Sequence, residues 1–368
     1  MLITAVQVHA ISIPLNSDLA IVSNIDARRA SDYVVVLIET DAGHRGIGEA
    51  TVSPAWSGET QGSAAAVIKQ TLRPVLLGRD PLQISKLLED MDRVIVGNPF
   101  SKAAVEMALL DIAGKSLGVP VYTLLGGARR APAIPIRFSI GAFSPPNAAK
   151  VAQIAVAMGL RAAKVKVGLD VTTDLERVAA VRDTVGSRFL LGVDANGGWT
   201  ESEAVAALPN LERMDVNVIE QPIRRGDFRG AARLRQRTRI PIMLDESVFT
   251  REDALEAVRT NACDIISIYP GKNGGIWRSL EIAQIAAAAG IECTIGSNLE
   301  WEIGSAAMLH CAAVVPNLST SVNHDIIGPL YHTKHLGGKL TIQEGCAIVP
   351  ATPGLGVEIP QPLEPSSE

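Results

Sequence analysis

The stretch LLGVDANGG (residues 190–198) is an apolar run that ends in the carboxylate of Asp194 and then in glycines. VNVIEQP (216–222) and PIMLDES (241–247) repeat this pattern with Glu220 and Asp245. Short β-branched runs that alternate with predicted helices indicate the buried strands of a parallel sheet. Seven or eight such strand–helix units within ~200 residues predict a (β/α) barrel, complete or incomplete, rather than an open sheet.

Ionisable residues follow the predicted strands at a constant phase. The strands are expected at 134–140, 162–167, 189–193, 216–219, 240–244, 265–268 and 292–295. The residues that close or follow strand-like runs are Lys166, Asp194, Glu220, Asp245, Lys272, Glu300 and Asp325, separated by 28, 26, 25, 27, 28 and 25 positions. In a barrel such residues converge on the mouth at the carboxyl ends of the strands, where barrel active sites lie.

The first part of the chain has a different pattern. Strands are expected at 3–14, 33–39 and 44–50, and helices at about 62–76, 81–94 and 101–116. Glycine and proline between residues 126 and 132 then indicate a boundary. We therefore predict an α+β domain over residues 1–128 and the barrel over 129–335.

Composition excludes several classes of protein. The 368 residues carry 34 Lys and Arg against 39 Asp and Glu, a net charge of −5, and only 4% are aromatic, which argues against nucleic acid as a partner. The four cysteines lie far apart without a CxxC motif, as expected for core residues in a reducing compartment. With no signal-peptide pattern and no run of ~18 apolar residues, the expectation is a cytoplasmic protein with no membrane span.

The three strand-end carboxylates predict a metal site. Asp194, Glu220 and Asp245 would repel one another at one barrel mouth unless a cation neutralised them. Oxygen ligands without His or Cys select Mg²⁺, with Mn²⁺ as the other candidate. The alternative is that one or two of these acids are helix caps or ion-pair partners at a strand end.

Three lysines predict acid/base chemistry. Lys164 and Lys166 in RAAKVKVG (161–168) share one strand face, since residues two apart point the same way. Lys272 in IYPGKNGG (268–275) follows a strand expected across the barrel, so two lysines could address opposite faces of one substrate carbon. The alternatives are an ion pair with a metal carboxylate for Lys164 and a loop position for Lys272. Glu300 and Asp325 could hydrogen-bond an enolate oxygen or orient a lysine.

The ordered set KVKVG, VDANGGW, IEQP, LDES, GKNGG and NLE resembles the enolase superfamily, and within it the muconate lactonizing enzyme (muconate cycloisomerase) subgroup. GIGEA (46–50), the stretch 101–127 and PGLGVEIP (353–360) extend the resemblance over the whole chain. It implies a modified TIM-type barrel behind an N-terminal α+β capping domain. It also implies a C-terminal segment, 336–368, that returns to the cap.

The resemblance also implies a role for individual residues. The metal ligands would be Asp194, Glu220 and Asp245; the acid/base residues would be Lys166 and Lys272, with Lys164 as companion and Glu300 as the seventh-strand acid. Asp325 stands where muconate cycloisomerases carry a glutamate, so the side chain at this position is one methylene shorter. The dipeptide epimerases of the subgroup carry Asp-x-Asp on that strand, and Asp325-Ile-Ile327 disfavours their specificity.

Specificity is expected from two cap loops, near residues 15–30 and 50–60. Arg28 and Arg29 could pair with a second substrate carboxylate or could be solvated. Trp56 and Trp301 could be pocket walls or could pack between the domains. Asn298 is the remaining expected substrate contact.

The favoured function is a Mg²⁺-dependent cycloisomerase of muconate-like dicarboxylates that acts through an enediolate. The alternatives are a racemase or epimerase of an amino-acid derivative, and a dehydratase. From other classes, a Schiff-base aldolase predicts borohydride trapping on Lys166 or Lys272, and a non-catalytic binding barrel predicts tolerance of lysine loss. The expected partners are a small carboxylate substrate and further copies of the chain, in a dimer or octamer.

Overall fold

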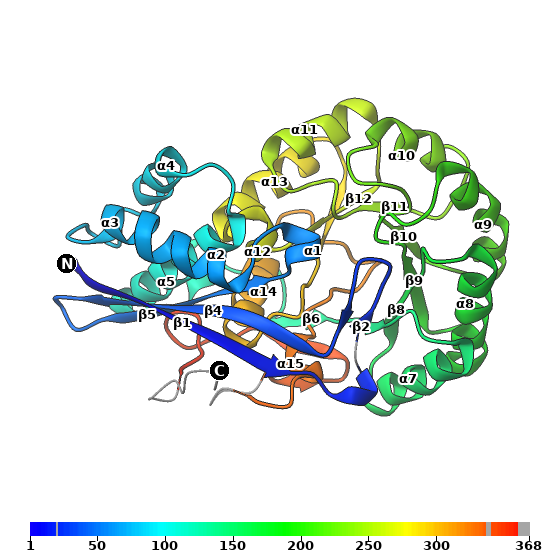
Figure 1. Cartoon of the computed structure of the whole chain (residues 1–368), viewed down its shortest axis with the longest axis horizontal. Helices are drawn as coiled ribbons and strands as arrows, with labels where there is room; N and C mark the ends of the chain where they lie inside the picture. Colours follow the sequence, from blue (N-terminus) through cyan, green and yellow to red (C-terminus); the bar gives the residue numbers. More distant parts are fainter. Residues whose placement is uncertain (20, 336–339, 360–368) are drawn as a thin grey trace.

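The computed structural model describes residues 1–19, 21–335 and 340–359, so positions 336–339 and 360–368 of the expected C-terminal segment lie outside the described residues. Figure 1 shows a curled parallel sheet with helices around its outside and an N-terminal α+β unit packed beside it. The predicted fold class, a (β/α) barrel with a capping domain, is therefore confirmed.

The cap is built on an antiparallel sheet with the strand order β1-β4-β5. Helix α5 (Pro99–Leu117) lies so close to β5 that a Cβ at Gly46 or Gly48 would be 2.0 or 1.8 Å from a carbonyl oxygen of that helix. Glycine is therefore required at both positions. The strands of the cap are β1 (Ile3–Pro14), β2 (Ile21–Val22), β3 (Ala27–Arg28), β4 (Ala30–Thr40) and β5 (Arg45–Val52).

The barrel sheet has the strand order β13-β12-β11-β10-β9-β8-β7. Its strands are β7 (Phe138–Ile140), β8 (Ala162–Lys166), β9 (Leu190–Asp194), β10 (Val218–Glu220), β11 (Ile242–Leu244), β12 (Ile265–Ile268) and β13 (Glu292–Ile295). These strands are short and buried, as the apolar runs predict. The expected strand at 134–140 is divided, because β6 (Ala133–Pro135) pairs with the C-terminal strand β15 (Cys346–Ile348), whereas β7 pairs with β8.

An irregular eighth segment closes the barrel. Parallel bridges join Cys293 to Leu318 and Ile136 to His324. The backbone N–H of Asp325 donates to the carbonyl of Ile295 at 2.8 Å, so this segment joins the end of β13 to the chain that enters β7. The closure brings Asp325 to the same mouth as Asp194 and Glu220, which end β9 and β10, and Asp245, which follows β11.

Helices cover the sheets and join the two units. They are η1 (Ser17–Leu19), α1 (Pro54–Ser57), α2 (Gln61–Ala66), the π-helical turn η2 (Val67–Leu72), α3 (Arg73–Leu76), α4 (Ile84–Val94), α5 (Pro99–Leu117), α6 (Val121–Leu124), α7 (Pro145–Ala157), α8 (Val171–Val185), α9 (Glu201–Arg213), α10 (Phe228–Arg235), α11 (Arg251–Thr260), α12 (Pro270–Asn273), α13 (Ile276–Ala288), α14 (Glu302–Val314) and α15 (Gly328–Tyr331). No helix in the described ranges is long and apolar enough to cross a membrane.

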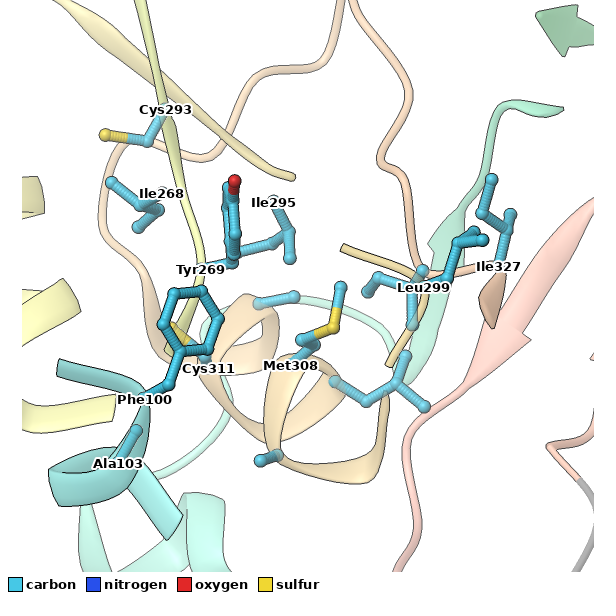
Figure 2. Close-up of a cluster of buried hydrophobic side chains, with 14 of the residues drawn as sticks. Phe100, Ala103, Ile268, Tyr269, Cys293, Ile295, Leu299, Met308, Cys311 and Ile327 are labelled. Atoms are coloured by element: carbon cyan, nitrogen blue, oxygen red, sulfur yellow. The ribbon is translucent and has the colours of Figure 1, made fainter. Parts of the chain in front are cut away.

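One apolar core extends from the cap into the barrel. Figure 2 shows Phe100 of α5 beside Tyr269, with Met308 and Cys311 of α14 and Ile295 of β13 in the same cluster. Buried carboxylates of the cap reinforce this contact: Glu106 on α5 accepts the first backbone N–H groups of α13, and Glu49 on β5 accepts those of Trp301 and Gly304 at the start of α14. The cap is thereby fixed over the mouth of the barrel.

The described part of the C-terminal segment contacts both units. Strands β14 (Ile342–Gln343) and β15 pair with β6 at the start of the barrel. Further along, the N–H of Leu355 donates to Asp111 of α5 at 2.8 Å. Asp111 also accepts from Ile47 and Lys115, so this one carboxylate ties the segment to the cap.

Candidate active site

A cavity lies at the carboxyl ends of the barrel strands, between the barrel and the two cap loops. From the cap, Ser23, Ile25, Asp26 and Trp56 line it. From the barrel, the lining residues include Lys164, Lys166, Asp194, Asn196, Asp245, Tyr269, Asn298, Leu299, Asp325 and Ile327. Most residues that the sequence singles out thus meet around one space, with both predicted loops above it.

The three predicted metal ligands lie on consecutive strands. Glu220 and Asp194 are direct neighbours in the parallel pairing of β10 and β9, and Asp245 follows β11 immediately. Each of the three side chains is at most 8% exposed. Lys164 lies among these acids, 3.2 Å from Asp194 and 2.9 Å from Glu220.

Two short ion pairs of the barrel interior involve Arg137, a residue that the sequence analysis does not identify. Its Nε and Nη2 donate to the two oxygens of Asp325 at 2.8 and 2.7 Å, and Nη2 also donates to Glu220 at 2.6 Å. Arg137 is 2% exposed and precedes β7. Its signal in the sequence is a single charge inside the apolar run IPIRFSI (134–140).

Electrostatics explain how these charges are tolerated. Burial opposes the charge of Lys164, but Asp325, Glu220 and Asp194 outweigh burial and raise its pKa above the ordinary value. Burial likewise opposes ionisation of Asp194, but Lys166 and Lys164 outweigh it and lower the pKa of that carboxyl. For Glu220 burial prevails, so its pKa is raised. The positive charge of Lys164 thus balances the three carboxylates around it.

Lys166 and Lys272 lie in different surroundings. The Lys166 amine donates to Asp194 at 2.7 Å and to the side-chain oxygen of Asn196 at 2.8 Å, and it lines the cavity. The Lys272 amine is fully buried behind Asp245, to whose Oδ1 it donates at 2.7 Å. It also lies 4.7 Å from the centre of the Tyr269 ring. Because Asp245 and Tyr269 line the cavity, Lys272 stands one layer behind its wall.

The acid Glu300 holds a loop together. Both of its carboxylate oxygens accept the N–H of Asn298 at 3.0 Å, and Oε2 accepts the Ser297 hydroxyl at 2.6 Å. The Asn298 amide in turn donates to the carbonyl of Thr51 in the cap. Asn298 lines the cavity, so the loop at 297–300 forms the wall next to the cap.

The structure places the other predicted substrate contacts differently. Trp56 lines the cavity, whereas Trp301 stacks on Tyr33 at 5.9 Å and donates to the carbonyl of Lys334, between the two units. Arg29 is exposed and is not among the lining residues. The backbone of Arg28 belongs to β3, but its side chain lies outside the described part of the structure.

The donor set fits a hard divalent cation, because Asp194, Glu220 and Asp245 offer only oxygen. Among the described residues, Oε2 of Glu246 is buried and has no hydrogen-bond partner. Burial together with Asp245 and Asp194 raises the pKa of this carboxyl to about 8. A cation beside these acids would lower the free-energy cost of burying their negative charges. Within the described ranges, no three acidic, His or Cys side chains are grouped as they would be around a metal ion. The three acids are instead paired with lysines.

Comparison with known proteins identifies the family. Residues 5–126 match the N-terminal domain model of mandelate racemase / muconate lactonizing enzyme, and residues 147–362 match the enolase C-terminal domain-like model. The chain is 35% identical to the N-succinyl-L-Arg/Lys racemase of Bacillus cereus over 98% of this chain and 96% of that protein.

Two solved structures are similar over nearly the whole chain. The 2-chloromuconate cycloisomerase of Rhodococcus opacus 1CP has a TM-score of 0.94 at 33% identity, with 98% of each chain covered. The dipeptide epimerase of Enterococcus faecalis V583, solved with Mg and the dipeptide L-Leu-L-Tyr, has a TM-score of 0.92 at 31% identity, covering 97% of this chain and 99% of that one. The chain therefore belongs to the mandelate racemase / muconate lactonizing enzyme family of the enolase superfamily. It is an enzyme of this superfamily, and the comparisons support an isomerase without choosing among racemase, epimerase and cycloisomerase.

Proposed function

We propose that this chain, as a member of the mandelate racemase / muconate lactonizing enzyme family, is a Mg²⁺-dependent racemase of an N-acylated amino acid. The observation that carries the proposal is that one lysine lines the cavity and a second lies directly behind its wall. Lys166 lines the cavity from β8, and Lys272 lies behind the wall that Asp245 and Tyr269 form after β11 and β12. Inversion at one carbon requires a proton acceptor on one face and a proton donor on the other.

Asp194, Glu220 and Asp245 would hold the ion. When bound there, Mg²⁺ supplies a Lewis acid for the substrate carboxylate and makes the proton on the neighbouring carbon easier to remove. In one direction the neutral amine of Lys166 takes that proton, and the ammonium of Lys272 delivers one to the opposite face. In the other direction the two lysines exchange roles. Lys164 and Arg137 stay charged throughout and balance Glu220 and Asp325.

The irregular eighth segment, which carries Asp325 and Ile327, supports an acylated rather than a free amino group on the substrate. Both oxygens of Asp325 already accept from Arg137, and Oδ2 also accepts from Lys164. Ile327, two residues on, presents an apolar side chain to the cavity. A substrate ammonium would find no available carboxylate on this segment, whereas an amide nitrogen needs none. This supports an N-acyl amino acid over a dipeptide with a free N-terminus.

Cycloisomerisation of a muconate-like dicarboxylate is the second candidate. It is supported by the similarity to the 2-chloromuconate cycloisomerase and by the apolar lining residues Ile25, Leu299 and Ile327. It requires only one of the two lysines to move a proton. A second substrate carboxylate, however, would find only Lys164 and Lys166 as cations among the described residues that line the cavity.

The deciding experiment measures proton exchange in D₂O with Mg²⁺ by NMR. The substrates are both enantiomers of N-acetyl and N-succinyl amino acids, together with cis,cis-muconate. Deuterium at the α-carbon with loss of optical rotation is the expected result, and Lys166→Ala and Lys272→Ala should each retain exchange with one enantiomer only. Lactone formation from muconate without exchange of the amino-acid derivatives would instead establish the second candidate. No turnover of either class, or full activity in both lysine variants, would overturn the proposal.

A further inference from the structure

Trp56, in the cap loop near residues 50–60, contacts the barrel. Trp56 on α1 donates from its indole Nε1 to Oε1 of Glu246 at 3.0 Å. Its ring packs against Tyr269 at 5.5 Å and Phe249 at 5.2 Å between ring centres. Since Phe249 and Tyr269 belong to the barrel, stacking and the indole hydrogen bond together fix Trp56 against it.

Glu246 links Trp56 to the side-chain amide of Asn196. The same Oε1 that receives Trp56 also accepts from Nδ2 of Asn196 at 2.7 Å. Asn196 has a positive φ of 43°, and its backbone N–H donates to Asp194 at 2.9 Å. The backbone of Asn196 is therefore held at the end of β9, and its side chain is held by the carboxylate of Glu246, which follows β11.

The asymmetry of an amide completes the connection. A primary amide has a donor end and an acceptor end. With Nδ2 committed to Glu246, Oδ1 faces the other way and accepts from the amine of Lys166 at 2.8 Å. Trp56, Glu246, Asn196 and Lys166 thus form one chain of hydrogen bonds, here termed the Trp56–Lys166 relay. The second lysine does not belong to it, because within the described ranges Lys272 donates to oxygens of Asp245 and Ser267 and to no member of the relay.

We propose that Glu246 and Asn196 are positioning residues that orient Lys166 when Trp56 docks. Closing the cap loop would then do more than exclude water, since it would also set one of the two acid/base amines in place. This inference rests on the proposed racemase function. It predicts an asymmetric effect: breaking the relay should impair the proton transfer at the face of Lys166 and spare that at the face of Lys272.

The test uses Trp56→Phe, which retains an aromatic ring and removes the indole N–H. Exchange in D₂O is measured separately for each enantiomer, and Lys166→Ala identifies which enantiomer depends on Lys166. For that enantiomer we expect exchange to fall about tenfold, the effect of one lost hydrogen bond, with less than about a twofold change for the other. Equal losses for both enantiomers, or no loss for either, would overturn the proposal.

Two further variants separate positioning from a general loss of structure. Glu246→Ala should show the same asymmetry. Glu246→Gln should restore the wild-type ratio of exchange rates between the enantiomers, because both donors use Oε1 and the other oxygen has no partner in the described part of the chain. Trp301→Phe is the matched control: this tryptophan also joins the two units, but its Nε1 donates to the carbonyl of Lys334. An asymmetry in Trp301→Phe would contradict the relay.

A second readout does not depend on turnover. Lysines are labelled with an amine-reactive reagent, and the labelled peptides are quantified by mass spectrometry, with the exposed Lys150 as internal standard. In Trp56→Phe, labelling of Lys166 should rise about threefold or more, while that of Lys272 stays constant. Unchanged labelling of Lys166 would overturn the relay. If the wild type exchanges no substrate but the labelling changes as expected, the racemase proposal fails and the relay stands.

Discussion

Arg137 and Asp325 form a bidentate ion pair inside the barrel: Nε of Arg137 is 2.8 Å from Oδ1 of Asp325, and Nη2 is 2.7 Å from Oδ2. Each side chain is 2% exposed. The two residues lie 188 positions apart, one at the entry to β7 and the other on the segment that closes the barrel. Because Nη2 also contacts Glu220, the pair joins the closure of the barrel to a predicted metal ligand.

Replacing Arg137 with methionine should cost about 3–5 kcal/mol of unfolding free energy, because Asp325 and Glu220 would then be buried with Lys164 as their shared cation. Urea denaturation at pH 7 measures this loss. Arg137→Lys keeps the charge but not the planar fork, so its loss should be smaller. A stability of Arg137→Met equal to that of the wild type would show that the pair is electrostatically unimportant.

The constant phase of polar residues predicts much of the site, because every strand–helix unit repeats one geometry. Lys166, Asp194 and Asp245 accordingly line one cavity. The phase does not reveal Arg137, whose partners come from distant units and whose only local signal is a charge in an apolar strand. Nor does it reveal that Lys272 lies behind Asp245, because side-chain depth depends on packing. The position of Trp301 between the units depends likewise on the stacking of Tyr33 from the cap.

Removing divalent cations with EDTA should abolish exchange, and Mg²⁺ should restore it. At a Mg²⁺ concentration 100 times Kd, binding should raise the unfolding free energy by about 2.7 kcal/mol, which thermal denaturation detects. Glu220→Gln should lose this stabilisation and bind Mg²⁺ more weakly in calorimetry. Asp170→Asn, at the exposed start of α8, is the control and should bind normally. Activity that survives EDTA would instead favour the Schiff-base alternative.

Glu49 should make stability depend on pH. Burial raises its pKa from 4.5 to about 7, so between these values the folded chain binds a proton that the unfolded chain releases. Its contribution is therefore complete below about pH 4.5 and is lost as the pH rises through 7, by at most ~3 kcal/mol. In urea denaturation at pH 5 and 7.5, Glu49→Gln should show a smaller fall than the wild type, whereas the exposed Glu89→Gln should not. Equal falls in all three proteins would contradict the assignment.

Tyr33 holds a strained part of the cavity wall. Its hydroxyl donates to the carbonyl of Leu299 at 2.7 Å and lies 2.6 Å from Nε2 of His332. Leu299 has a φ of 62°, which costs a residue with a Cβ about 1 kcal/mol or more and persists only where neighbours fix it. Burial lowers the pKa of His332 to about 4, so the ring is neutral at pH 7.

Tyr33→Phe removes both hydrogen bonds while retaining the ring that stacks on Trp301. We expect a loss of about 1–3 kcal/mol of unfolding free energy, because the buried polar groups of Leu299 and His332 lose the hydroxyl as a hydrogen-bond partner. Since Leu299 lines the cavity and takes no part in proton transfer, KM for the exchanged substrate should rise more than kcat falls. Tyr122→Phe, whose ring packs on His310 instead, is the matched control and should leave both constants unchanged. A kcat defect with normal KM in Tyr33→Phe would show that this contact acts on the lysines rather than on the cavity wall.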